Sequence, residues 1–165
     1  MQFRDFVPAD LEEVFSFARA LLDVPPFDGA RRELSRYPRH DLVAKVAVGA
    51  EGRIVGFCAA THPYWNAIAM VDYLVVEESH RKRGVGRELL QSVEAELVRA
   101  GLRGVCVQTA LWNEGAIRFY ERLDYERLAV LPEYFGSGND AVWLHRRFPH
   151  GTPRSATTPH PLTVS

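Results

Sequence analysis

The chain has 165 residues, a formal net charge of −1 at pH 7 and a hydrophobic fraction of 47%. This length and composition fit one globular domain with a single core and exclude a wholly disordered chain. The near-neutral charge gives no reason to expect nucleic-acid binding. No apolar run is long enough for a membrane span and no signal-peptide segment opens the sequence, so we expect a cytoplasmic protein without membrane contact.

The first forty residues predict one strand and two helices. Gln2–Arg4 fits a short strand, and Asp10 fits the N-cap of a helix that Pro25 and Pro26 end. A second, weaker helix is expected from about Gly29 to Tyr37. The first helix has one apolar face, formed by Leu11, Val14, Phe15, Ala18, Leu21 and Leu22.

From residue 41 the hydrophobic period changes to that of strands. Leu42–Val48 and Ile54–Thr61 are predicted to form a hairpin around the turn at Glu51-Gly52. Met70–Val76 is a third strand in this series, and residues 62–67 form the connecting loop.

The second half predicts two more helices and three more strands. The elements are a helix at Arg83–Ala100, a strand at Gly104–Ala110, a helix at Asn113–Leu123, and strands at Glu126–Leu131 and Asp140–Phe148. The order predicts an α+β domain, residues 1–148, in which helices flank a mixed sheet. Residues 149–165 are rich in Pro, Thr and Ser without a period, which favours a disordered tail.

The cysteines and histidines give no sign of a metal site. Cys58 and Cys106 lie in apolar, strand-like runs, so buried free thiols are favoured over a disulfide. The six histidines are scattered, without the paired spacing of zinc ligands.

A basic, glycine-containing segment lies between a predicted strand and a helix: Arg81, Lys82, Arg83, Gly84, Val85, Gly86 and Arg87. Glycines let backbone amides turn toward an anion, and a helix N-terminus attracts negative charge. Cations at such a terminus cost roughly 0.3–1 kcal/mol each, which a bound anion would offset. The segment lacks the third glycine of a dinucleotide fingerprint and the Gly-Lys-Ser/Thr of a Walker A loop. The alternative is a solvated basic turn.

Residues 74–86, LVVEESHRKRGVG, resemble the cofactor motif of the GNAT acetyltransferase superfamily. The family often has proline where Glu78 stands here. The resemblance implies a GNAT-like domain with a central twisted sheet of antiparallel and parallel strands. It also implies that the amides of Arg81–Arg87 bind the coenzyme A pyrophosphate. The strand at Leu74, Val75 and Val76 would be splayed and bulged, so that its backbone pairs with the pantetheine arm of acetyl-CoA.

Residues 113–125, NEGAIRFYERLDY, resemble a second motif of the same family, with Asp124-Tyr125 in place of Gly-Phe. The resemblance implies that Asn113 contacts the pantetheine amide and that Tyr120 lies near the cofactor sulfur. A thiolate with a pKa of about 8.5 leaves during acetyl transfer, and a phenol can protonate it or stabilise it by hydrogen bonding. The structural alternatives are a helix cap for Asn113 and a core position for Tyr120.

The amine acceptor must lose a proton, to a carboxylate or to a water chain. Asp72 is our candidate base, because it precedes Leu74 by two residues and should share its face unless a bulge intervenes. Weaker candidates lie in or near loops: His62, His80, Glu133 and Tyr134.

The acceptor itself is open between a small amine and a protein N-terminal amine. Residues 132–142 resemble the last hairpin of bacterial enzymes that acetylate ribosomal-protein N-termini. In those enzymes an acidic residue lies on the strand before the second motif, where this chain has Gln108. The segments 22–39 and 62–67 are expected to line the acceptor site, with an aromatic wall of Tyr37, Tyr64 and Trp65. A non-catalytic acetyl-CoA sensor is the alternative function, and a homodimer through the final hairpin is a further possibility.

Overall fold

The computed structural model describes residues 1–22, 35, 41–62 and 65–149. Within them, seven strands form a single sheet in the order β1-β2-β3-β4-β5-β7-β6. The strands are β1 (Gln2–Asp5), β2 (Leu42–Val48), β3 (Ile54–Thr61), β4 (Ile68–Val76), β5 (Gly104–Ala110), β6 (Glu126–Leu131) and β7 (Ala141–Arg147). Every neighbouring pair is antiparallel except β4 and β5, which are parallel. The predicted α+β class with a mixed sheet is confirmed.

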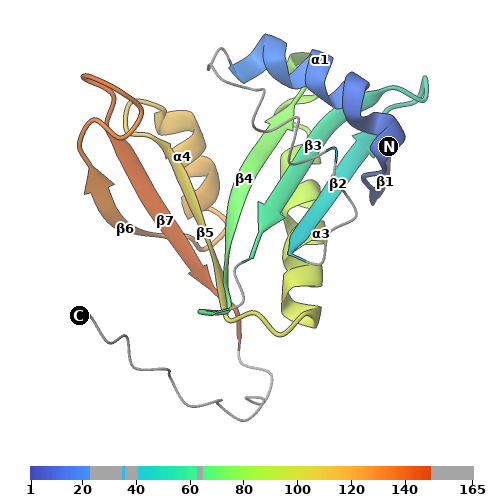
Figure 1. The fold of residues 1–165 in the computed structure, drawn as a ribbon. Coiled ribbons are helices and arrows are strands. Elements are labelled where there is room, and N and C mark those ends of the chain that lie inside the picture. The colour runs from blue at the N-terminus through green and yellow to red at the C-terminus, as the bar shows by residue number, and fades with distance from the viewer. Residues whose placement is uncertain (23–34, 36–40, 63–64, 150–165) are drawn as a thin grey trace.

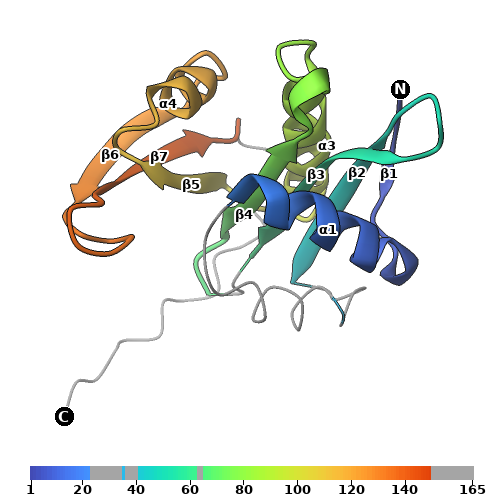
Figure 2. The same ribbon diagram turned by 90° about the horizontal axis from the view of Figure 1, so that it is seen from above.

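Three α-helices of the described residues flank the sheet. These are α1 (Leu11–Leu22), α3 (Val85–Arg99) and α4 (Glu114–Glu121). Viewed from above, α1 lies on one face, and α3 and α4 lie on the other (Figure 2). The apolar side chains divide accordingly into a core under α3 and α4 and a smaller core under α1. No helix of the described residues is long and apolar enough to cross a membrane.

The sheet opens between its two central strands. β4 pairs with β5 only from Ile68↔Gly104 to Val71↔Val107. β5 continues beside β7 to Ala110, and β4 continues beside β3 to Val76. The two strands therefore diverge beyond Val71 and Val107, as Figure 1 shows. We call this opening the β4–β5 splay. The splayed strand expected at Leu74–Val76 is confirmed.

A β-bulge lies at the start of the splay. Tyr73 pairs with Ala59 and Val71 pairs with Ala60, so Asp72 is the extra residue of β4. A bulge shifts the alternation of side chains by one position. Val71 and Leu74, three residues apart, consequently both pack on the α3 side. The bulge was expected at Leu74–Val76, and that position was wrong. The face shared by Asp72 and Leu74, expected in the absence of a bulge, does not follow here.

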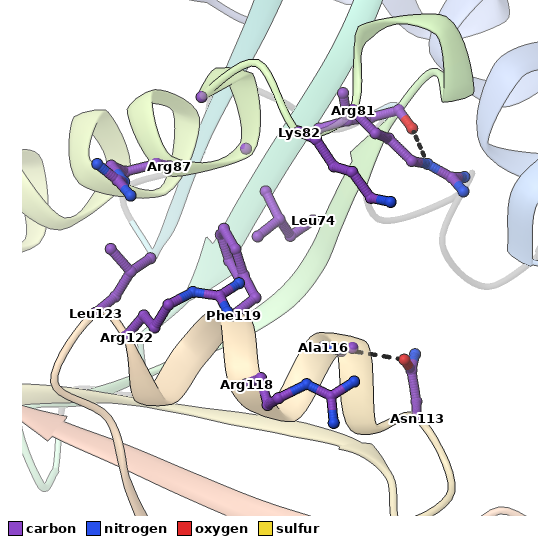
Figure 3. A pocket seen from close by; sticks show the side chains of 14 residues that line it. Leu74, Arg81, Lys82, Arg87, Asn113, Ala116, Arg118, Phe119, Arg122 and Leu123 are labelled. Atoms are coloured by element: carbon purple, nitrogen blue, oxygen red, sulfur yellow. Dashed lines mark hydrogen bonds between the residues drawn. The ribbon is translucent and has the colours of Figure 1, made fainter.

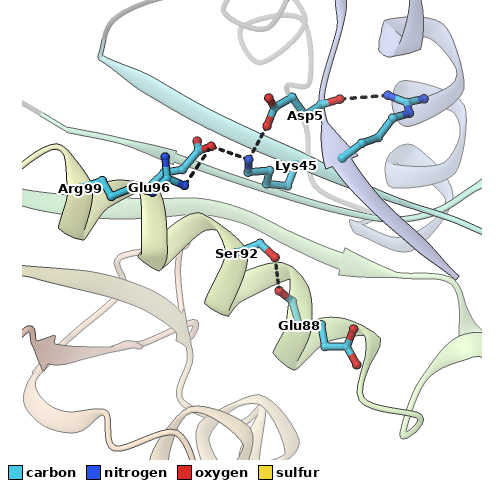
Figure 4. A network of polar contacts seen from close by, with 7 residues as sticks. Asp5, Lys45, Glu88, Ser92, Glu96 and Arg99 are labelled. Carbon is cyan, nitrogen blue, oxygen red and sulfur yellow. Dashed lines mark hydrogen bonds and ion pairs between the residues drawn. The ribbon is translucent and has the colours of Figure 1, made fainter.

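A polar network attaches α3 to strands β1 and β2 at one edge of the sheet. The ammonium group of Lys45 on β2 binds the carboxylates of Asp5 on β1 and Glu96 on α3 (Figure 4). Burial lowers the pKa of Lys45, but the two carboxylates outweigh it and raise the pKa above the ordinary value. The charged lysine therefore fixes the position of α3 across β1 and β2.

Several local expectations need correction. Asp10 is not the N-cap of α1 but the last residue of a 3₁₀ turn, η1 (Pro8–Asp10). Its carboxylate reaches back to the Val7 amide at 2.9 Å and to Arg4 at 2.7 and 2.9 Å, anchoring the turn to β1. The helix expected at 29–37 and the tail after 149 lie outside the described residues, as do Tyr37 and Tyr64. Cys58 and Cys106 are buried free thiols, as expected.

Candidate functional site

A groove of about 740 Å³ lies between the start of α3, the end of β4 and one side of α4 (Figure 3). We call it the α3–α4 groove. Its lining includes these residues expected from the sequence: Leu74, Val76, Arg81, Lys82, Gly84, Gly86, Arg87 and Asn113. Of the other expected residues, Val75 and Val85 are buried and Arg83 is exposed, and none of the three lines the groove.

The N-terminus of α3 opens into the groove without a side-chain cap. Gly84 is the N-cap residue, with φ of +86° in the left-handed region, and no side chain of the described residues bonds the first amides of the helix. Two residues earlier, Lys82 also has a positive φ, +59°. Left-handed backbone is costly for residues other than glycine and often marks a functional turn. The turn therefore leaves helix amides free to bind an anion.

Gly86 lies where the start of α3 approaches both β4 and α4. A Cβ at this position would lie 3.5 Å from Val76 Cγ2 and 3.7 Å from Phe119 Cζ. A single methyl group is therefore accommodated, but a larger side chain would have to extend into the groove. The strand end is fixed from the other side, because Arg81 Nε donates a hydrogen bond of 2.9 Å to the Val76 carbonyl.

Helix α4 supplies the opposite wall. Asn113 is its N-cap, and Oδ1 accepts a hydrogen bond of 3.1 Å from the Ala116 amide. The helix cap, which was the structural alternative for Asn113, is observed, and Asn113 also lines the groove. Sequence reasoning missed the other residues of this wall, which lie on α4 or directly after it: Gly115, Ala116, Arg118, Phe119, Arg122 and Leu123. The spacing of Arg118 and Arg122, four residues apart, was the available signal, because it places both on one helix face.

The charge of the groove is strongly positive although the whole chain carries −1. Five cationic side chains line it, and no carboxylate does: Arg81, Lys82, Arg87, Arg118 and Arg122. Arg118 binds Glu114 at 2.7 Å, whereas Lys82, Arg87 and Arg122 have no ion-pair partner among the described residues. Free helix amides and unpaired cations form a donor set that suits the phosphates of coenzyme A.

Tyr120 lies beside the groove, on the buried side of α4. Its side chain is 6% exposed, and its ring contacts those of Phe119 and Tyr125 at centroid distances of 5.1 and 5.3 Å. No described residue hydrogen-bonds its hydroxyl group. Burial, with a smaller contribution from nearby Cys58, raises the pKa of Tyr120 above its ordinary value. The phenol therefore stays protonated at neutral pH and can act as a hydrogen-bond donor.

Asp72 is exposed, and its carboxylate is held at the end of β3. Oδ2 accepts hydrogen bonds from the Thr61 amide at 3.0 Å and from Thr61 Oγ1 at 2.9 Å. Gln108, on the opposite strand, is half-buried, and its Oε1 is buried with no hydrogen-bond partner in the part of the chain that the structure describes. Both residues follow directly after the last β4–β5 pair.

The weaker base candidates are scattered over several loops. His80 Nδ1 lies 2.9 Å from Glu77 Oε2, in the segment just before the basic turn. The ring of Tyr134 packs against that of Trp143 on β7, with centroids 6.3 Å apart. Glu133 stands in the loop between β6 and β7, with its amide bonded to Asp140, and His62 follows β3. Trp65 is 84% exposed. Among the described residues there is no group of three or more side chains placed to hold a metal ion.

Comparison with known proteins finds acetyltransferases, both by a family profile and by a relative in sequence. The sequence profile of the acetyltransferase (GNAT) family matches residues 10–125. The uncharacterized N-acetyltransferase MJ1530 of Methanocaldococcus jannaschii is 28% identical over 152 residues, covering 91% of this chain and 94% of its own.

Solved structures share the fold. An aminoglycoside 6′-N-acetyltransferase complexed with coenzyme A has a TM-score of 0.78 at 22% identity, covering 92% of this chain and 100% of its own. The ribosomal-protein-S18-alanine N-acetyltransferase of Escherichia coli has a TM-score of 0.79 at 15% identity, covering 93% and 97%.

The mixed α+β fold of this chain is the fold of these acetyltransferase structures. This chain belongs to the acetyltransferase (GNAT) family and is an N-acetyltransferase of that family. The family resemblance of the two sequence motifs is thereby confirmed.

Proposed function

We propose that the protein transfers the acetyl group of acetyl-CoA to a primary amine by direct attack, with the β4–β5 splay as the reaction site. The observation that carries the proposal is the continuity of the α3–α4 groove with the splay. Leu74 and Val76 of the splayed strand line the same groove as the basic turn. Phosphates bound at Arg81–Arg87 would leave the pantetheine arm to run along β4 toward Asp72 and Gln108.

The backbone of β4 suits that arm. Leu74–Val76 pair with β3 on one side and have no strand partner among the described residues on the other. Amide and carbonyl groups on that side can pair with the amides of pantetheine and polarise the thioester carbonyl. Asn113, which already caps α4, offers its side-chain NH2 group to the same arm.

The chemical step needs one acid and one base. The amine nitrogen bonds to the thioester carbonyl carbon, the carbon–sulfur bond breaks, and the sulfur leaves with the bonding pair. Tyr120 gives or shares its proton with that thiolate, and the amine proton passes to Asp72 or to water. The buried, protonated phenol fits the role of the acid. The exposed carboxylate, held by Thr61, fits that of the base.

A small amine is our first candidate acceptor, and a protein N-terminal amine is the alternative. Fold relatives act on both kinds, since one is named for aminoglycosides and another for the alanine of ribosomal protein S18. Gln108 cannot act as a base, and this favours the small amine. A homodimer is a further part of the proposal, because β6 is an edge strand with Leu128 and Val130 58% and 51% exposed.

Thiol release from acetyl-CoA tests the proposed function. The purified protein should release thiol only when an amine is added, and mass spectrometry should find the acetylated amine. The panel holds an amino sugar, an amino-acid amide, a diaminoalkane and a short peptide with a free N-terminus. Acetyl-CoA binding by calorimetry with no turnover on any amine would contradict transfer and favour an acetyl-CoA sensor.

A further inference from the structure

Two buried polar atoms beside the β4–β5 splay have no hydrogen-bond partner among the described residues. They are Oε1 of Gln108, an acceptor, and Nε1 of Trp143, a donor. The two residues stand directly opposite each other in the β5–β7 ladder. A buried donor or acceptor without a partner costs about 1–3 kcal/mol, and such groups are rare in native proteins. Because the two atoms belong to one cross-strand pair, a single bound molecule can satisfy both.

Both side chains lie on the sheet face opposite to α3 and α4. Their strand neighbours Val107, Val142 and Leu144 pack in the core under those helices. Side chains alternate along a strand, so Gln108 and Trp143 point to the other face. Tyr120 and the α3–α4 groove lie on the helix side. An amine that attacks a thioester held in the splay would therefore meet Gln108 and Trp143 from the face opposite to the acid.

Gln108 and Asp72 occupy equivalent positions on the two strands that separate at the splay. Gln108 is the first residue of β5 beyond the last pair with β4, and Asp72 is its counterpart on β4. Asp72 supplies a negative charge, whereas Gln108 and Trp143 supply neutral hydrogen-bonding groups. Charge attraction and hydrogen-bond recognition of an ammonium compound are thus available on opposite sides of the splay.

We propose that Gln108 and Trp143 together select an acceptor whose amine is next to an oxygen atom. Gln108 Oε1 accepts a hydrogen bond from the amine, and Trp143 Nε1 donates one to the oxygen. Directly opposite residues have Cβ atoms about 4.5–5.5 Å apart, which suits an N–C–C–O arrangement. Amino alcohols, amino sugars and α-amino carbonyl compounds have this arrangement, and simple diaminoalkanes do not. The inference rests on the proposed acetyl transfer.

The proposal includes a side-chain movement that opens the two atoms to the acceptor. Gln108 and Trp143 are each half-buried, although the two polar atoms are screened from solvent. The ring of Tyr134 packs edge-on against Trp143 and is 44% exposed. In the proposal, the Gln108 amide or the Tyr134 ring rotates to expose the pair while β5 and β7 remain paired.

The test compares matched amines. The specificity constant kcat/KM is measured for alaninamide and for 6-amino-6-deoxyglucose, which have the oxygen, and for propylamine and cadaverine, which lack it. Rates are expressed per concentration of unprotonated amine, which removes the difference in amine pKa. The wild type should favour the oxygen-bearing amines by about tenfold or more. The two oxygen-bearing probes distinguish a peptide-like acceptor from a sugar-like one.

Two variants test whether Gln108 and Trp143 produce the preference for oxygen-bearing amines. Trp143→Phe keeps the ring and removes the N–H, so it should lower kcat/KM about tenfold for the oxygen-bearing amines and leave propylamine unchanged. Gln108→Leu should lower kcat/KM for every amine. Gln91→Leu, at an exposed position of α3, is the matched control. All three variants should keep the wild-type affinity for acetyl-CoA.

The outcomes separate this inference from the proposed function. Turnover without preference in the wild type, or an equal effect of Trp143→Phe on all amines, overturns the recognition pair but leaves acetyl transfer intact. Absence of turnover on every amine overturns both.

Discussion

Val71 of β4 and Val107 of β5 form the last paired position between the two parallel strands. Both side chains are buried in the core under α3 and α4. Beyond them the strands part, with Asp72 on one side and Gln108 on the other. A parallel pair that ends in mid-sheet leaves backbone groups unpaired, and an extended substrate can satisfy them. The end of this pairing therefore defines where the acetyl group should lie.

Two glycines with positive φ provide a matched test of the basic turn. Gly84 and Gly52 have φ of +86° and +76°, and an added Cβ meets nothing within 4 Å at either position. Alanine at each should lower the free energy of unfolding by about 1–2 kcal/mol through backbone strain. Only Gly84→Ala should also weaken acetyl-CoA binding. Gly84 is the N-cap residue of α3 and lines the groove, whereas Gly52 lies in the turn between β2 and β3. Calorimetric affinities that fall equally for both variants would contradict the assignment.

Gly86→Val tests the groove itself. The valine methyl groups would extend past the 3.5 Å contact with Val76 into the space between β4 and Phe119. We expect acetyl-CoA affinity to fall by at least about tenfold while urea denaturation shows a folded protein. Normal affinity would show that the cofactor lies elsewhere.

Tyr120→Phe separates acid catalysis from packing. Phenylalanine fills the same buried space, so acetyl-CoA affinity and stability should be retained, while kcat falls by about 10²-fold. Because burial raises the pKa of Tyr120, the wild-type kcat should not fall as the pH rises through 10. An unchanged kcat in the variant would remove Tyr120 from the mechanism.

Asp72→Asn distinguishes a carboxylate base from a water chain. If Asp72 accepts the amine proton, kcat/KM for the amine should fall by about 10²-fold, with an unchanged affinity for acetyl-CoA. Asp124→Asn is the matched control, because Asn tolerates the left-handed backbone of Asp124 at φ of +63°. Near-normal rates in Asp72→Asn would assign the proton to water.

An ion pair between the buried Glu94 and the partly exposed Arg146 gives a prediction for stability. Glu94 of α3 is 4% exposed, accepts a hydrogen bond of 2.7 Å from the Tyr125 hydroxyl and binds Arg146 of β7. Burial raises the pKa of Glu94, although Tyr125 and Arg146 act in the opposite direction. Arg146→Met leaves a buried carboxylate unpaired and should cost about 3–5 kcal/mol at pH 7.

The pH dependence of this cost has a definite sign. An unfolded glutamate has a pKa of about 4.3, and the folded value in the variant lies higher. Between the two values the folded state holds the extra proton, so its stability increases as the pH falls. The deficit of Arg146→Met relative to wild type should therefore be smaller at pH 5 than at pH 7 in urea denaturation. Arg127→Met, which removes an exposed pair with Glu121, should cost at most about 1 kcal/mol at both pH values. A deficit that does not depend on pH would refute the role of Glu94.

The sequence predicts those parts of the fold that depend on local periodicity and turn chemistry. The strands Leu42–Val48, Ile54–Thr61, Gly104–Ala110 and Glu126–Leu131 have the expected bounds. Long-range pairing could not be derived in the same way. The bulge at Asp72 depends on the register between β3 and β4, and no local residue marks it. The unpaired state of Gln108 and Trp143 depends on a β5–β7 pairing between residues far apart in the sequence.

The candidate site likewise has a part that the sequence predicts and a part that depends on long-range packing. The basic turn and Asn113 are predicted because their residues are contiguous and their chemistry is local. Arg118 and Arg122 join the groove only because α4 packs beside α3, and Asp10 binds Arg4 because η1 folds back on β1.

A crystal structure with acetyl-CoA tests the central claim most directly. The account predicts the pyrophosphate on the amides of residues 82–87, the pantetheine arm along Leu74–Val76, and the sulfur within roughly 3–3.5 Å of the Tyr120 hydroxyl. The thioester carbonyl should lie in the β4–β5 splay, between Tyr120 on one face and Gln108 on the other. A pantetheine arm outside the splay, or a sulfur remote from Tyr120, would contradict it.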